Sequence, residues 1–328
     1  MNRRHAGLAP LLGLMALGAA LPAARAQQTA RLHRIGFVSP TAPGPRGDAF
    51  LQGLREFGYV EGRNARIDMR FAEGQPDRLP GLVEEMIRVK VDVLVVGATI
   101  GASAAKKATS TIPIVFAGSS DPVAGGIVSN LSRPGGNITG FSLAYGDGFA
   151  GKWLELLKAA APDVSHVAAL WSSSNAAATR FVKDLEVAAQ VSKVRLDAHH
   201  AANAAQLDAA FAAIAGSGAR GLVVMPSPFA FASRDKLVRF AAARRMPAMY
   251  FAEDFTDAGG LMSYGPSISD SYRRAAAHGD KILKGAKPGD LPVEQPSRYE
   301  MAINLSTAKS LGLVIPQALL LQANHVID

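Results

Sequence analysis

The sequence contains no cysteine among its 328 residues. Disulfides and thiolate metal sites are therefore excluded, as is a lipid anchor attached to cysteine, and a hydrophobic core must hold the fold. Beyond the N-terminal leader, no apolar run approaches the roughly 20 residues that a membrane-spanning helix needs. With 48% hydrophobic residues, the chain has enough apolar side chains for a large globular core.

The first 26 residues have the order of charges and apolar residues that is typical of a secretory signal peptide. Arg3 and Arg4 precede an uncharged apolar run over Leu8–Leu21, and Ala24-Arg25-Ala26 supplies a small-x-small cleavage site. We expect removal of residues 1–26 from the 328, which leaves 302 residues. Without a lipidation cysteine, this pattern predicts an untethered protein in the periplasm.

Basic residues are scattered rather than clustered. The formal net charge is +8, and the leader carries three arginines and no acid, so the remaining chain has a net charge of +5. No run of five or six like charges is present, and the basic doublets lie far apart in sequence. We therefore expect no nucleic-acid partner. We also expect a monomer that binds a small molecule.

Short apolar runs alternate with helical stretches along most of the chain, which predicts an α/β fold of doubly wound parallel sheets with helices on both faces. The first half has predicted strands over 33–38, 65–71, 91–96 and 112–116, with helices over 46–57, 77–88 and 101–109. The second half has strands over 138–142, 166–171, 194–198, 221–225 and 247–251, with helices over 149–160, 176–191, 204–215 and 233–244.

A turn-rich stretch at Arg133–Asn137 separates these halves. After Gly260 the pattern changes to a strand over 261–264, a helix over 269–283, a loop over 284–296, a strand over 298–304 and a helix over 306–311. This tail is too small for a third domain, so we expect it to cross between the halves. The predicted lobes are 31–142 with about 264–293, and 143–263 with about 294–328. Hinges are expected at 139–142, 263–266 and 292–296.

Local catalytic motifs are missing. The stretch Gly146–Lys152 has the glycine and lysine spacing of a phosphate-binding loop, but Trp153 stands where a Ser or Thr would bind Mg²⁺. His199 and His200 are neighbours on a predicted strand, so they point to opposite faces and do not chelate together. We expect no catalytic residue, no metal ligand and no cofactor.

Polar residues recur where predicted strands end, which is the edge of an open parallel sheet at which ligands bind. Serine and threonine at helix starts present N–H groups to a carboxylate, and Asp121 and Asp254, one from each half, suit an ammonium group. Each residue taken alone also suits an ordinary helix cap. The predicted ligand-binding residues are Ser39, Thr99, Ser119, Asp121, Ser142, Asn175, Ser227, Tyr250 and Asp254.

Several segments resemble one family of binding proteins. They are Phe50–Asn64 (FLQGLREFGYVEGRN), Lys106–Phe116 (KKATSTIPIVF), Leu131–Gly140 (LSRPGGNITG) and Leu311–Pro316 (LGLVIP). In these the chain resembles the substrate-binding proteins of ABC transporters that are related to tryptophan- and tyrosine-binding proteins. The resemblance implies a type I periplasmic-binding fold, with two lobes joined by three crossovers, an amino acid or related carboxylate as ligand, and an inner-membrane ABC permease as partner.

Two other classes of protein fit the same α/β pattern, because fold alone does not fix function. One is a secreted enzyme such as a hydrolase, for which a histidine-activated nucleophile in the cleft would be diagnostic. The other is a ligand-binding sensor domain. Recovery of an unchanged ligand from the purified protein would favour a solute-binding protein over the enzyme.

Overall fold

The structure, a computed structural model, describes residues 32–145, 148–172 and 176–328. The predicted signal peptide lies outside the described residues. In the part of the chain that is described, no helix is both long and apolar enough to cross a bilayer. Residues Leu32–Asp328 form one compact unit that contains two β-sheets.

The first sheet has five parallel strands in the order β2-β1-β3-β4-β5. Its central strand β3 reads VLVVG and is buried throughout, as a strand covered on both faces requires. The bounds are β1 His33–Ser39, β2 Ala65–Phe71, β3 Val93–Gly97, β4 Ile114–Ser119 and β5 Ile138–Ser142.

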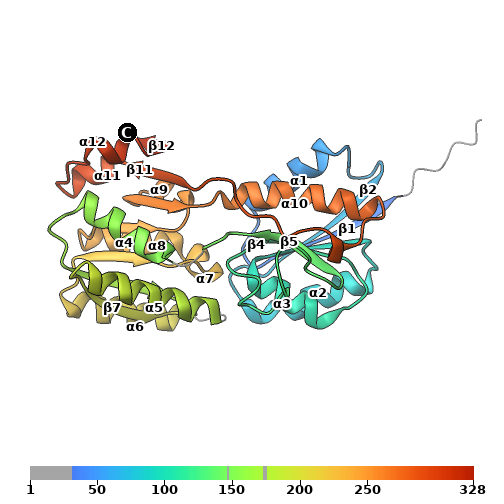
Figure 1. Cartoon of the computed structure of the whole chain (residues 1–328), viewed down its shortest axis with the longest axis horizontal. Coiled ribbons are helices and arrows are strands. Elements are labelled where there is room, and N and C mark those ends of the chain that lie inside the picture. Colours follow the sequence, from blue (N-terminus) through green and yellow to red (C-terminus); the bar gives the residue numbers. More distant parts are fainter. Residues whose placement is uncertain (1–31, 146–147, 173–175) are drawn as a thin grey trace, which may run out of the picture. The chain divides into compact units, whose positions relative to one another are not determined.

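Helices cover both faces of this sheet. On one face α1 (Pro45–Glu56) lies beside α10 (Ile268–Leu283), and α2 (Leu79–Arg88) and α3 (Ala98–Ala108) cover the other, as Figure 1 shows. Successive strand residues point to opposite faces, so Phe37 packs in the cluster on the α1 side and Val38 in the cluster on the α2 side.

The second sheet has the order β12-β11-β10-β9-β8-β6-β7. Its strands are β6 His166–Trp171, β7 Arg195–His200, β8 Gly221–Val224, β9 Ala248–Tyr250, β10 Met262–Gly265, β11 Glu300–Asn304 and β12 His325–Ile327. Its helices are α4 Phe149–Ala160, α5 Ala176–Val191, α6 Ala204–Ser217, α7 Pro228–Ala232, α8 Arg234–Ala243, α9 Glu253–Asp257, α11 Leu305–Ser310 and α12 Gln317–Leu320.

The predicted α/β class with parallel-dominated sheets is confirmed, with two differences. Strands β10 and β11 pair antiparallel, because the chain leaves the sheet after β10 and returns beside it in the opposite direction. The short elements α7, α9, α12 and β12 were not predicted, since three to five residues are too few to show a periodic pattern.

Within the described residues, the chain passes between the two sheets three times: after Ser142, after Gly265 and along residues 292–299. The first and third passages are hydrogen-bonded to each other. The Glu294 N–H donates to the Gly140 carbonyl at 2.9 Å, and the Ser142 N–H donates to the Glu294 carbonyl at 2.9 Å. Two of the predicted hinge segments therefore lie side by side.

His278 of α10 lies beside these two passages and is almost fully buried. Its Nε2 is 3.1 Å from the Pro292 carbonyl, and its ring meets Phe141 edge-on at 4.8 Å. Its Nδ1 is 3.7 Å from Glu294, which is itself paired with Arg274. Burial lowers the pKa of His278 below its ordinary 6.5, against the opposing effects of the Pro292 carbonyl and Glu294, while Lys281 and Arg274 add to the lowering.

We expect His278 to make the protein less stable in mild acid. The unfolded chain takes up the proton near pH 6.5, whereas the folded chain takes it up only at lower pH, so stability is complete above pH 6.5 and falls below it. Each pH unit in that window removes up to about 1.4 kcal/mol. Urea unfolding measures the free energy of unfolding at pH 7 and at pH 5. The decrease between these two pH values should be smaller for His278→Gln than for the unmodified protein. Equal decreases would contradict the prediction.

Candidate ligand-binding site

A cavity lies where strands of both sheets end at their carboxyl edges. Its empty volume is about 620 Å³, including the space at its mouth. Ala98 and Thr99 follow β3. Gly118 lies near the end of β4, and Ser120 directly follows that strand. Ser227 and Phe251 follow β8 and β9. The described lining consists of Arg46, Ala98, Thr99, Ile100, Gly118, Ser120, Leu143, Ala178, Phe181, Pro226, Ser227, Pro228, Phe251, Ile268 and Tyr272.

Arg46 is the charged member of this described lining. It stands in the first turn of α1, directly after Pro45, and its Cζ lies 3.5 Å from the centroid of the Phe231 ring. Its Nε is buried and has no hydrogen-bond partner. A buried guanidinium nitrogen without an acceptor favours a ligand that brings one, and a carboxylate matches the guanidinium fork best.

The start of α3 adds backbone donors to the same cavity. The N-cap residue of α3 is Gly97, so no side chain caps the helix, and Ala98 has a φ of 58°. That left-handed conformation is strained for alanine and is typical of functional sites. Ala98, Thr99 and Ile100 all line the cavity, so the positive end of the α3 dipole lies at the site.

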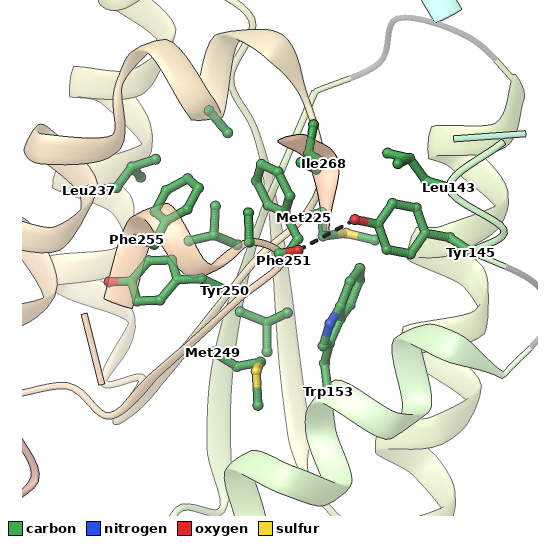
Figure 2. Close-up of a cluster of buried hydrophobic side chains, with 14 of the residues drawn as sticks. Leu143, Tyr145, Trp153, Met225, Leu237, Met249, Tyr250, Phe251, Phe255 and Ile268 are labelled. Atoms are coloured by element: carbon green, nitrogen blue, oxygen red, sulfur yellow. Dashed lines mark hydrogen bonds between the residues drawn. The ribbon is translucent and has the colours of Figure 1, made fainter. Parts of the chain in front are cut away.

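The rest of the lining is mainly apolar. Figure 2 shows Leu143, Ile268 and Phe251 near Tyr145, whose hydroxyl donates to the Phe251 carbonyl at 3.4 Å. Phe181 of α5 meets Tyr145 edge-on at 5.9 Å and also lines the cavity. These side chains provide an apolar wall for the body of a ligand.

Tyr272 of α10 closes the part of the cavity next to Arg46. Its side chain is fully buried, and its hydroxyl lies over Gly97, where a Cβ would come within 2.2 Å of it. Burial raises the pKa of Tyr272, and the nearby Arg46 guanidinium and Ser39 hydroxyl act in the opposite direction. The tyrosine therefore stays a neutral phenol beside the arginine.

Of the residues predicted from sequence, Thr99 and Ser227 line the cavity directly. Ser119 is not part of the described lining but contacts it through Thr99, with the Ser119 Oγ 2.9 Å from the Thr99 Oγ1. Ser39 and Ser142 bond locally: the Ser39 Oγ is 3.0 Å from the Thr41 Oγ1, and the Ser142 Oγ accepts from the Ala144 N–H at 3.0 Å.

Asp121 lies outside the described cavity lining and its oxygens are already engaged. One oxygen accepts the N–H groups of Val123 and Ala124 at 3.1 and 2.9 Å, which is a helix-cap pattern. The other accepts from Arg180 of α5 at 2.5 Å. In this structure Asp121 therefore links the end of β4 to a helix of the second sheet.

The remaining three predicted residues lie elsewhere. Tyr250 is fully buried and stacks on Phe255 at 4.8 Å, within the core and away from the cavity. Asp254 lines a different depression with Glu253 and Asp257. Asn175 lies outside the described residues.

Several lining residues were not predicted from sequence, namely Arg46, Phe181, Phe251 and Tyr272. A signal for Arg46 was present: a basic residue follows the Pro-Gly-Pro turn that leads from the first strand into its helix. The aromatic residues show no local signal, because their approach to the cavity depends on how the second sheet and α10 pack.

One cluster among the described residues has groups that could hold a metal ion. Glu253, Asp257 and His325 place ligand atoms within 4.8 Å of one another, and all three residues are exposed. Burial, and next the neighbouring Asp257, raise the pKa of Glu253. Exposed carboxylates beside a histidine are common at protein surfaces, and we assign no metal to them.

Comparison with known proteins decides the family. The chain matches the family described as "ABC transporter substrate binding protein" over residues 37–327. The protein belongs to that family. Its α/β architecture also recurs in solved type I periplasmic binding proteins.

Three relatives illustrate the likeness. A tyrosine-binding protein of Clostridioides difficile is 25% identical over 265 residues, which are 80% of this chain and 75% of that protein. The ABC domain from Streptococcus pneumonia in complex with L-Trp has a TM-score of 0.82 and 25% identity, covering 90% of this chain and 100% of that one. A conserved domain protein from Vibrio cholerae has a TM-score of 0.82 and 28% identity, with the same coverage.

Proposed function

We propose that this substrate-binding protein works outside the cytoplasm, as the periplasmic component of an ABC importer. It captures a small carboxylate, an amino acid or a related acid, in the cavity between its two sheets and delivers it unchanged to an inner-membrane permease. The observation that carries the proposal is Arg46, a cation with an unpartnered buried Nε in a mainly apolar cavity.

The two-sheet arrangement supports this role. Each sheet with its helices forms a proposed lobe, 31–142 with about 264–293 and 143–263 with about 294–328, and the three passages between the sheets are proposed hinges. Contacts that span the two sheets include Arg46 on Phe231 and Asp121 with Arg180. A ligand held by groups from both lobes would favour the form that brings them together.

The test is carboxylate binding by an Arg46→Gln variant. A panel of amino acids and monocarboxylic acids is first screened against the unmodified protein by isothermal titration calorimetry. The tightest binder should lose at least tenfold in affinity with Arg46→Gln, because a charge-assisted hydrogen bond disappears from a desolvated site.

Arg234→Gln is the matched control. Arg234 also faces the Phe231 ring, with its Cζ 5.6 Å from the centroid, but it lies outside the described cavity lining. Its substitution should leave affinity unchanged. Equal affinity for Arg46→Gln and the unmodified protein would refute this cavity as the carboxylate site, and chemical conversion of the bound acid would favour the enzyme alternative.

A further inference from the structure

The cavity has an unequal balance of charge. Arg46 and the amino end of α3 make it electropositive, whereas no carboxylate occurs among the described residues that line it. An ordinary amino acid brings an ammonium group along with its carboxylate. Burying that ammonium without a counter-charge costs several kcal/mol, and neutral oxygens compensate only in part.

The neutral oxygens of the cavity already take part in hydrogen bonds within the protein. The Thr99 Oγ1 accepts from the Ser120 N–H at 3.2 Å and shares a hydrogen bond with Ser119. The Ser227 Oγ accepts from the Ala230 N–H at 2.9 Å as the cap of α7. The Tyr272 phenol lies against Ser39 and Arg46.

The aspartate nearest in sequence to the cavity residue Ser120 also has hydrogen-bond partners already. Asp121 accepts from two backbone N–H groups and from Arg180. Turning it toward an ammonium would break the ion pair with Arg180 and uncap the turn that follows. Its charge is therefore balanced before a ligand arrives.

We infer that the preferred ligand is a monocarboxylate with an apolar body and no α-ammonium group. This inference rests on the proposed function and narrows its ligand class. Arg46 and the start of α3 bind the carboxylate, while Leu143, Phe181, Phe251 and Ile268 enclose the body. Amino acids and ammonium-free monocarboxylates are told apart by pairs of ligands that differ only in the ammonium group.

The experiment measures affinity for such pairs by calorimetry on the signal-peptide-free protein. The pairs are L-phenylalanine with 3-phenylpropanoate, L-tyrosine with 3-(4-hydroxyphenyl)propanoate, and L-leucine with 4-methylpentanoate. Phenethylamine, which has the ammonium and no carboxylate, completes the set. We expect the best-bound acid to bind at least tenfold tighter than its amino acid, and phenethylamine not to bind.

A charge-insertion variant provides a second measurement. Ser120→Asp places a carboxylate in the cavity lining and should shift the ratio of affinities at least tenfold toward the amino acid. If that variant fails to fold, the ratio measured on the unmodified protein still decides.

The outcomes separate the two ideas. An amino acid that binds as tightly as its ammonium-free partner, or tighter, overturns the inference and leaves the proposed function standing. Binding of phenethylamine alone, or of no carboxylate in any pair, overturns both.

Discussion

Gly53→Ala should destabilise the protein by about 3 kcal/mol, at the upper end of what overpacking costs in a close-packed interior. Gly53 lies in α1 where that helix crosses α10. A Cβ there would lie 2.2 Å from the Arg273 carbonyl oxygen and 2.9 Å from the Ala276 Cβ. The nearest atom belongs to backbone, which has no rotamer to change, so the two helices must move apart.

Gly81→Ala is the matched control for this effect. Gly81 is exposed in α2, and a Cβ there would meet nothing within 4 Å. Alanine has the higher helix propensity, so this variant should gain roughly 0.5–1 kcal/mol. Urea unfolding followed by circular dichroism measures both. Effects of similar size and the same sign in the two variants would show that α1 and α10 do not pack this closely.

Trp153→Ala should cost about 3–5 kcal/mol, the range for deleting a large buried aromatic. Trp153 of α4 is fully buried, and its indole N–H donates to the Tyr264 carbonyl at 2.7 Å. Its ring lies 5.8 Å from Tyr145 and 5.2 Å from Phe149. Removal leaves a cavity and an unpaired carbonyl at once.

Trp171 provides the comparison, since the chain has two tryptophans. Trp171 ends β6, is only partly buried, and meets His200 edge-on at 5.0 Å. Trp171→Ala should cost on the order of 1 kcal/mol, because less apolar area returns to water. If Trp171→Ala proves the more damaging change, the core does not depend on Trp153 in this way.

Long periodic elements were predictable because their pattern is local. Strand Ile138–Ser142 and helix Phe149–Ala160 have the predicted bounds. Trp153 illustrates the limit: sequence showed only that it spoils a phosphate-loop motif, whereas its partner Tyr264 is 111 residues away.

Site residues were harder to predict because neighbours along a strand point in opposite directions. Tyr250 was expected at the site, yet Phe251, one residue later, lines the cavity while Tyr250 packs in the core. Ser119 and Ser120 differ in the same way, and Ser120 lines the cavity. A difference of one position along the chain therefore separates a cavity-lining residue from a core residue.

The position of α10 also constrains when the protein folds during its synthesis. The strands of the first sheet are complete at Ser142, but the helix that lies beside α1 on one of its faces ends only at Leu283. Until the ribosome has made about 140 further residues, that face keeps apolar side chains such as Phe37 and Val95 without their final cover. The first sheet therefore reaches its final packing late, after most of the chain has been made.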